Sequence, residues 1–280
     1  MERGRGRVNI APLPFPVDGA VAMLKDTKHL VLVGSAPPVA FFAYPNKPRM
    51  IKQPDCEVLT LATLTHDIEA SLQALVDALG AQNTAPAQVS NGPIITDLPT
   101  GAPIAEHIGT VIAALLPENA IMVDEAVTTG RQFAKVTPQA APHDCIDITG
   151  GAIGWGMSAA VGAAVACPDR KVFAFLGDGS AMYTVQGLWS MARENLDVMV
   201  VIFANRSYKI LRGELANMGG PEAGDNARRM LDLDQPFLDW VSIARGHGVP
   251  GVQVNTLEGF AEAMRIAAKE KGPRLIELVM

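Results

Sequence analysis

The sequence predicts an α/β protein built on a doubly wound, six-stranded parallel sheet, with a small partial α/β unit at its N-terminus. Two observations predict this fold. From about residue 104, short apolar runs alternate with segments of helical periodicity, which is the pattern of a parallel sheet covered by helices on both faces. Before that, a stretch rich in Gln, Asn, Thr, Pro and Gly indicates a linker. We therefore expect a small unit over 1–85, a linker over 86–103 and a main domain over 104–280.

The first unit holds one clear strand and one clear helix. The apolar run from His29 to Gly34 ends in glycine, as buried parallel strands often do. The segment from Ile68 to Leu79 carries apolar residues at helical spacing and is stopped by Gly80. The Gly-spaced arginines within Met1 to Arg7 predict a frayed terminus rather than a binding arm.

The main domain contains six expected strands, all apolar and bounded by turn residues. They are Ala120 to Val123, Cys145 to Ile148, Lys171 to Leu176, Val198 to Ala204, Val252 to Val254 and Arg274 to Val279. The expected helices are Ile104 to Leu116, Gly130 to Lys135, Gly156 to Ala166, Val185 to Glu194, turns after Tyr208, Phe237 to His247 and Leu257 to Lys271. Ligands of such sheets bind at the carboxyl ends of the strands, so the residues that follow each strand are the candidates for function.

Composition excludes several classes of protein. With 23 Lys and Arg against 29 Asp and Glu, the chain carries a net charge of −6, so no basic field exists to hold nucleic acid. No apolar run reaches the roughly 20 residues of a membrane-spanning helix. The three cysteines match neither a zinc pattern nor a disulfide framework, which predicts free thiols in the cytoplasm.

A Gly-Asp-Gly motif follows the expected strand Lys171 to Leu176. Its glycines, Gly177 and Gly179, allow the backbone to approach an anion closely, and Asp178 is free to bind a hard cation. The next strand ends at Asn205, so an aspartate and an asparagine would meet at one edge of the sheet and could share a Mg²⁺ ion. The simpler alternative is a strand-to-helix turn in which Asp178 caps the helix.

A second motif supports a competing hypothesis. The segment from Gly154 to Ala159 fits the dinucleotide-binding pattern G-x-G-x-x-A, and Asp178 at the next strand end could hold an adenine ribose. This alternative, a nicotinamide-dependent dehydrogenase, leaves both glycines of the Gly-Asp-Gly motif and the position of Asn205 unexplained.

The Gly-Asp-Gly motif, one helix and one strand before Asn205, resembles the diphosphate signature of thiamine diphosphate (ThDP) enzymes. The segments Asn205 to Arg212 and Gly150 to Gly162 are similar to those of the acetolactate synthase and benzoylformate decarboxylase branch. Arg206 stands where the family has a second asparagine. The resemblance implies that this chain holds the end of a middle domain followed by the diphosphate-binding domain.

The resemblance also implies a role for individual residues. Asp178, Asn205 and the carbonyl of Ser207 would bind Mg²⁺. Ile153 would support the bent form of ThDP, although its sequence context alone favours a core residue. The remaining positions expected to contact the cofactor are Val127, Thr128, Gly151, Gly177, Gly179, Ser180 and Tyr208. Capping of helices is an equally sensible local role for Thr128 and Ser180.

The implied activity is decarboxylation or C–C ligation of a 2-oxo acid such as pyruvate, in which the cofactor accepts the electrons released with CO₂. The family needs an activating glutamate from a pyrimidine-binding domain, and Glu106, Glu125, Glu194 and Glu214 are not its counterparts. We therefore expect that domain to act in trans, within a homo- or hetero-oligomer. A non-catalytic ThDP-binding fragment or subunit is the alternative, and FAD binding stays open.

Overall fold

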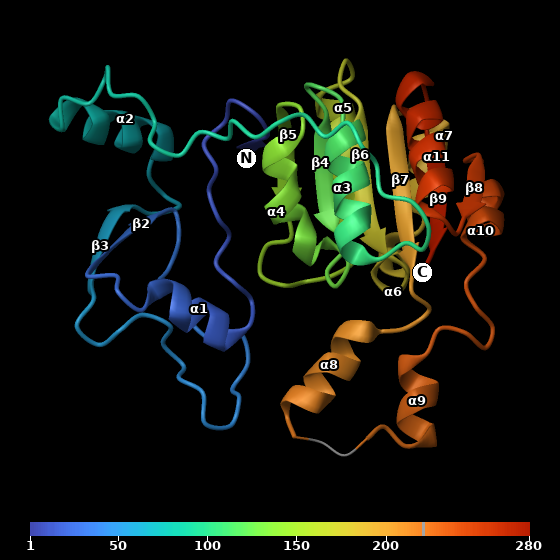
Figure 1. Cartoon of the computed structure of the whole chain (residues 1–280), viewed down its shortest axis with the longest axis horizontal. Helices are drawn as coiled ribbons and strands as arrows, with labels where there is room; N and C mark the ends of the chain where they lie inside the picture. The colour runs from blue at the N-terminus through green and yellow to red at the C-terminus, as the bar shows by residue number, and fades with distance from the viewer. Residues whose placement is uncertain (220–221) are drawn as a thin grey trace. The chain divides into compact units, whose positions relative to one another are not determined.

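The computed structural model describes residues 1–219 and 222–280 of the chain. It contains two compact units, of which the larger comprises Met1–Ile10 with Gln88–Met280 and the smaller Ala11–Ala87. Figure 1 shows the mixed arrangement of helices and strands in each unit. The first ten residues therefore lie with the larger unit, whereas the sequence analysis placed them with the smaller one.

The larger unit is built on a seven-stranded sheet in the order β1-β5-β4-β6-β7-β9-β8. The six predicted parallel strands are confirmed as β4 (Ile121–Glu125), β5 (His143–Asp147), β6 (Val172–Gly177), β7 (Val198–Ala204), β8 (Gly251–Val254) and β9 (Arg274–Val279). β7 is buried along its whole length, and β6 is buried except at Gly177, because both faces of these central strands are covered.

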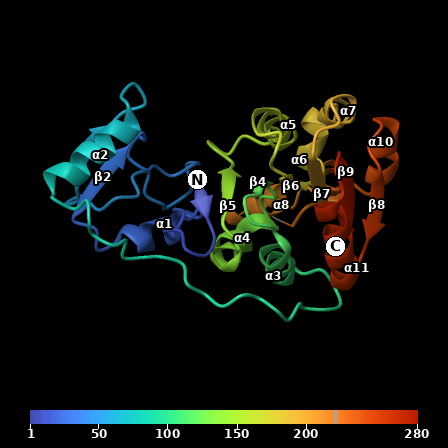
Figure 2. The same ribbon diagram turned by 90° about the horizontal axis from the view of Figure 1, so that it is seen from above.

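Helices cover both faces of the sheet, as the alternating pattern predicts (Figure 2). One face packs against α3 (Ala105–Leu115), α4 (Phe133–Val136) and α11 (Leu257–Lys269), around a core that includes Phe133, Phe175 and Phe203. The other face packs against α5 (Gly156–Ala166), α7 (Gly187–Arg193) and α10 (Trp240–Gly246). Alternate residues of each central strand contribute to the two cores, which is the two-residue period of a strand.

The seventh strand, β1 (Glu2–Arg3), was not predicted. It pairs antiparallel with β5, and the N-terminal ammonium group donates to the carbonyl of Cys145 at 3.0 Å. Arg3 forms an ion pair with Asp147 at 2.9 Å. The expectation of a frayed terminus is therefore wrong: these polar residues are ordered by an edge strand whose sequence has no apolar run to reveal it.

Several short elements lie at the carboxyl end of the strands, where Figure 1 also shows the C-terminus. They are α6 (Asp178–Ala181), α8 (Lys209–Asn217) and α9 (Asp225–Leu231), together with the 3₁₀ turn η3 (Met182–Thr184). Neither α8 nor α9 has a buried residue. Two further 3₁₀ turns, η1 (Gly130–Gln132) and η2 (Thr137–Gln139), flank α4 on the way from β4 to β5.

The smaller unit has a modest core. Its two parallel strands, β2 (His29–Val33) and β3 (Glu57–Ala62), accompany α1 (Val17–Leu24) and α2 (Ile68–Ala78). The strand at His29 and the helix at Ile68 were predicted, whereas α1 and β3 were not. The buried residues Val17, Ala20 and Ile51 form its core cluster.

The segment predicted as a linker, 86–103, lies almost entirely within the larger unit. Val89 forms an antiparallel bridge with Val8, and Leu98 packs against the core beside α3 and α11. The predicted domain boundaries at residues 85 and 103 stay predictions, because a division into compact units does not by itself define domains.

Candidate functional site

The connections of β4 and β6 form a topological switch point at the carboxyl edge of the sheet, where doubly wound folds have their ligand crevice. These two strands are neighbours, yet the chain leaves β4 for β5 on one side and leaves β6 for β7 on the other. Such a reversal of direction opens a space between adjacent loops, and ligands of doubly wound sheets bind there. The loops after β4, β5, β6 and β7 therefore form the candidate site.

Asp178 begins α6 directly after β6 and is only 3% exposed. Its Oδ1 accepts a hydrogen bond from its neighbour Gly179 N at 2.9 Å, and its Oδ2 accepts one from Arg206 N at 2.6 Å. Burial raises the pKa of Asp178 to about 6, even though both backbone N–H groups favour the charged form. The first contact is not a helix cap, because Gly177 occupies the N-cap position of α6 and no side chain caps that helix. The second contact reaches across to the residues after β7.

Asn205 and the two residues after it form a tight turn beyond β7. Asn205 Oδ1 accepts a hydrogen bond from Ser207 N at 3.0 Å, and Arg206 has a positive φ of 54°. Ser207 also forms a bridge with Asp232, and its Oγ donates to the Leu231 carbonyl at 3.2 Å. The guanidinium of Arg206 lies 4.7 Å from the centre of the Phe237 ring, in the range of a cation–π contact.

The ring of Tyr208 lies so close to Gly179 that a larger residue would not fit at this position unless the ring moved. A Cβ at this position would lie 2.6 Å from Tyr208 Cε1 and 3.3 Å from Leu233 Cδ1. Ser180 is buried and its Oγ donates to the Gly177 carbonyl at 3.1 Å. The structure thus brings Gly179 against Tyr208, while Ser180 and Gly177 contact each other within the Gly-Asp-Gly segment.

The loop after β4 has a strained backbone. Val127 has a positive φ of 41°, which is rare for a β-branched side chain and is typical of functional loops. Asp124 Oδ1 accepts from Ala126 N at 2.9 Å, and a Cβ on Gly130 would lie 2.7 Å from the same oxygen. The hydroxyl of Thr128 makes no hydrogen bond within residues 1–219 and 222–280, so it is not a helix cap there.

The adjacent residue of this loop contacts the chain's end. Thr129 Oγ1 donates to the sulfur of Met280 at 3.5 Å, and Met280 N donates to the Ala204 carbonyl at 3.2 Å. The C-terminus is therefore tied between the loop after β4 and the end of β7.

The glycine-rich loop after β5 joins these loops through Glu125, the last residue of β4. The Glu125 carboxylate accepts hydrogen bonds from Gly154 N, from Trp155 N at 3.2 Å and from Gly156 N at 2.9 Å. Gly150 and Gly151 have positive φ angles of 65° and 67°, which glycine adopts readily. Ile153 is 37% exposed and belongs to neither core cluster of the larger unit, so the core role that its sequence context favours is wrong.

The oxygen donors near Asp178 fit a hard divalent cation. The carboxylate of Asp178 and the amide oxygen of Asn205, which both accept from N–H groups of the turn, are donor types that suit Mg²⁺, an ion that prefers few protein ligands together with phosphate oxygens. Among the described residues, no group of three or more His, Cys, Asp and Glu side chains could hold a metal ion. Any metal at this edge would thus depend on Asp178 and neutral oxygens.

Two buried carboxylates near the site were not predicted as functional. Glu125 is 1% exposed, and its partners are backbone N–H groups, which sequence identity does not reveal. Glu277 on β9 is 0% exposed; its Oε2 accepts from Gln253 at 3.1 Å, while its Oε1 has no partner among the described residues. Burial raises the pKa of both carboxyls. A charged residue inside the apolar run of β9 was the signal available in the sequence.

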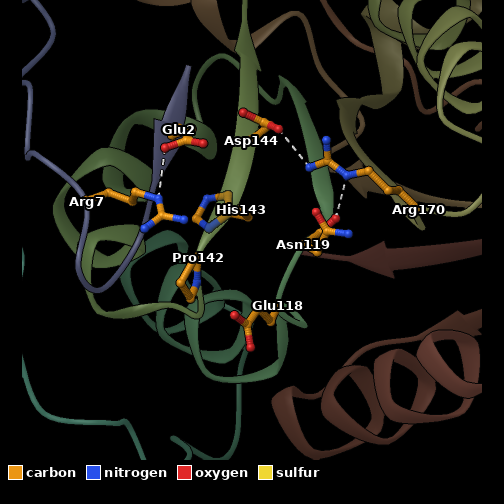
Figure 3. A pocket seen from close by; sticks show the side chains of 8 residues that line it. All are labelled: Glu2, Arg7, Glu118, Asn119, Pro142, His143, Asp144 and Arg170. Carbon is orange, nitrogen blue, oxygen red and sulfur yellow. Dashed lines mark hydrogen bonds and ion pairs between the residues drawn. The ribbon is translucent and has the colours of Figure 1, made fainter.

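A pocket of about 200 Å³ lies at the opposite end of the strands (Figure 3). Its lining comes from residues just before or at the starts of β4, β5 and β6, together with Glu2 and Arg7. Arg170 forms an ion pair with Asp144 at 2.8 Å, and Arg7 forms one with Glu2 at 2.9 Å. Both arginines that line the pocket are therefore already paired with carboxylates of the protein. The pocket is separate from the glycine-rich loops and contains none of the predicted site residues.

Glycine-rich loops after the strands of a doubly wound sheet are typical of the class of α/β proteins that bind phosphate-bearing cofactors. Comparison with known proteins gives the family. Residues 126–278 match the family described as thiamine pyrophosphate enzyme, C-terminal TPP binding domain. The chain belongs to this family, as its sequence motifs predicted.

Individual relatives agree with this assignment. The Mycobacterium tuberculosis protein named "Putative acetolactate synthase large subunit IlvX" is 47% identical over 281 residues, which cover 100% of this chain and 54% of that protein. Benzoylformate decarboxylase of Pseudomonas aeruginosa is 33% identical over 77% of this chain and 39% of its own length. The chain thus spans about half, or less, of the curated relatives it matches.

A solved structure shows the same fold. The ThDP-dependent 4-hydroxybenzoylformate decarboxylase of Rhodococcus jostii RHA1 superposes with a TM-score of 0.78, at 24% identity, over 99% of this chain and 55% of its own. The α/β architecture predicted from the sequence is confirmed by this likeness. No helix in the described part of the chain is long and apolar enough to span a membrane.

Proposed function

We propose that this chain binds ThDP together with Mg²⁺ and acts as part of an acetolactate-synthase-like enzyme on 2-oxo acids, by decarboxylation and C–C ligation. One observation carries the proposal most: the carboxylate of Asp178 is bonded to the N–H of Arg206, the residue after Asn205, at 2.6 Å. The two halves of the resemblance-based signature therefore meet at the crevice. The names of the curated relatives support the same class of substrate.

The site residues divide by chemistry. Asp178, Asn205 and the Ser207 carbonyl would hold the metal, which neutralises the charge of a diphosphate. Gly177, Gly179, Ser180 and Thr128 would bind that diphosphate, with Val127, Gly151 and Tyr208 lining the same loops. When bound, the cofactor would supply the electron sink that decarboxylation of a 2-oxo acid needs.

Partners complete the proposal. The family's activating glutamate would come from a pyrimidine-binding domain outside residues 1–280, supplied in trans within an oligomer. A cytoplasmic location accords with Cys56, Cys145 and Cys167, which are all free thiols in the structure. FAD binding is not part of the proposal.

The structure also bears on the dehydrogenase alternative. That hypothesis would place a dinucleotide pyrophosphate at the amino end of α5. The Glu125 carboxylate already accepts from Gly154, Trp155 and Gly156 at that end. A pyrophosphate at this end of α5 would be repelled by the Glu125 carboxylate and would find these backbone N–H groups already hydrogen-bonded. We therefore do not retain the nicotinamide alternative.

Calorimetry of ThDP binding tests the proposal directly. We expect binding that requires Mg²⁺ in the unsubstituted chain and is lost in Asp178→Ala, while Asp169→Ala, at an exposed aspartate, binds normally. Normal ThDP–Mg²⁺ binding by Asp178→Ala would contradict the metal assignment, and tight metal-independent NAD binding would contradict the whole proposal.

Turnover separates an enzyme module from a non-catalytic binding subunit. Pyruvate consumption is measured for the purified chain alone and after addition of a pyrimidine-binding domain of the same family. We expect turnover only in the second case. Turnover by the chain alone would contradict the need for an outside glutamate, and ThDP binding without turnover in either case would favour the non-catalytic alternative.

A further inference from the structure

The amino end of α5 is filled by a side chain of the protein itself. Glu125, at the end of β4, is 1% exposed and accepts hydrogen bonds from Gly154 N, Trp155 N and Gly156 N. The free N–H groups and the dipole at the start of an eleven-residue helix form an anion-binding position. Here the anion is internal, so this position does not depend on a ligand.

The fit around Glu125 leaves the loop little freedom. A Cβ on Gly156 would lie 2.7 Å from Glu125 Oε2 and 2.5 Å from Leu176 Cδ2. A Cβ on Gly154, whose φ is +93°, would lie 2.5 Å from Tyr183 Cβ. Both glycines are therefore needed for the backbone to reach the carboxylate.

Both the backbone N–H and the backbone carbonyl of Gly154 form hydrogen bonds to side chains. Its N–H donates to Glu125 Oε1, and its carbonyl accepts from Thr184 Oγ1 at 2.7 Å. The first contact comes from the end of β4, and the second comes from η3, which follows β6 and α6. The residue just before this clamped peptide is Ile153, which no core cluster of the larger unit holds in place.

We propose that Glu125 is a positioning residue, which fixes the Gly150–Gly154 loop and thereby sets the place of Ile153 in the crevice. The part that concerns Ile153 and the cofactor rests on the proposed function, whereas the part that concerns the loop does not. Glu125 itself would not touch the cofactor, because its carboxylate is buried among the three backbone donors.

The substitution Glu125→Gln tests the loop without adding volume. Glutamine keeps one acceptor oxygen but turns an NH₂ group toward backbone donors, so at least one hydrogen bond to a charged acceptor is lost. The matched control is Glu118→Gln, at an exposed glutamate in the larger unit. Both variants are first compared by thermal unfolding, to identify any global loss of stability.

Amide hydrogen exchange of the cofactor-free chain gives the first readout. We expect the amides of Gly154, Trp155 and Gly156 to exchange about tenfold faster in Glu125→Gln, with β7 unchanged. The control should exchange as the unsubstituted chain does. Unchanged exchange at these three amides would overturn the proposal, whatever the chain binds. If Glu125→Gln does not fold, Glu125→Asp, which keeps the charge but retracts it, is measured instead with the same expectation.

A double-mutant cycle on ThDP affinity, measured by calorimetry with Mg²⁺, gives the second readout. We expect Glu125→Gln and Ile153→Ala each to weaken binding about tenfold, and the double variant to bind no more weakly than the weaker single variant. Additive losses would show that Glu125 does not act through Ile153. Absence of ThDP binding in the unsubstituted chain would refute the proposed function and the link to the cofactor, while the exchange result would still decide the loop.

Discussion

The carboxylate of Asp178 and the backbone N–H of Arg206 form a 2.6 Å hydrogen bond between the ends of β6 and β7. The elements η3, α7 and β7 lie between these residues in the sequence, and the bond links the Gly-Asp-Gly segment to the residue after Asn205. Asp178 is 3% exposed and forms no salt bridge with any residue that the structure describes. The first prediction concerns the charge of this carboxylate.

Metal affinity should depend on pH around the pKa of Asp178. Burial raises this pKa to about 6, so a proton competes with Mg²⁺ over a range in which an exposed aspartate is already ionised. We expect ThDP–Mg²⁺ binding to be about tenfold weaker at pH 5 than at pH 8. Calorimetry across this range checks it. An affinity that stays constant between pH 8 and pH 5 would argue against Asp178 as a ligand.

A methyl group at Gly179 should destabilise the turn through Tyr208. The Cβ of Gly179→Ala would lie 2.6 Å from Tyr208 Cε1, so the ring must move, at a cost of about 1–3 kcal/mol in unfolding free energy. In a Tyr208→Ala background the same change should cost less than half as much. Denaturant unfolding measures all three variants.

The control for this change is Gly162→Ala in α5. A Cβ there would meet nothing within 4 Å, so alanine should stabilise the helix by up to about 1 kcal/mol. Equal destabilisation at both glycines would mean that crowding against Tyr208 is not the cause.

Removing the charge of Glu277 should stabilise the protein at neutral pH. Burial raises the pKa of this carboxyl above its value in the unfolded chain, so folding favours its protonated form. The stability from that form is complete below the unfolded pKa and is lost as pH rises through the folded pKa. We expect Glu277→Gln to raise the Tm at pH 8 by a few degrees and to change it little at pH 4.

Glu277 Oε1 has no hydrogen-bond partner in the part of the chain that the structure describes, so an NH₂ group at that position breaks no hydrogen bond found there. The exposed Glu118→Gln should leave the Tm unchanged at both pH values. A lower Tm for Glu277→Gln at pH 8 would show that the ionised carboxylate stabilises the fold.

Relief of strain at Val127 should stabilise the chain. Glycine adopts a φ of +41° without steric cost, and we expect Val127→Gly to raise the unfolding free energy by about 1 kcal/mol. The matched control is Val165→Gly in α5, which should lower it by about 1 kcal/mol because its backbone is helical. Urea unfolding distinguishes the two signs, and a loss at both positions would mean that the loop holds Val127 without strain.

Long apolar strands and glycine-bounded helices were predictable because their signal is local. The limits of α5, Gly156–Ala166, agree with the sequence analysis at both ends, and β7 agrees as well. The strand at Glu2–Arg3 was not predictable, because its two residues are polar and only pairing with β5 orders them. The local pattern of apolar residues thus predicted the six parallel strands but not the antiparallel edge strand β1.

The site was predictable only in part, for a similar reason. Residue types drew attention to Asp178, Asn205 and the glycines, and the structure brings these together at the crevice. The role of Glu125 depends on three main-chain donors, and any residues at positions 154–156 other than proline carry such donors. No pattern of side chains could therefore have identified its partners.

The tie between Met280 and both Thr129 and Ala204 has a practical consequence for anyone who handles this protein. A purification tag or a fluorescent fusion joined after Met280 would emerge beside the loop that carries Val127 and Thr128. Such an addition would crowd that loop, so measurements of the proposed cofactor binding are best made with a cleavable extension and repeated after its removal.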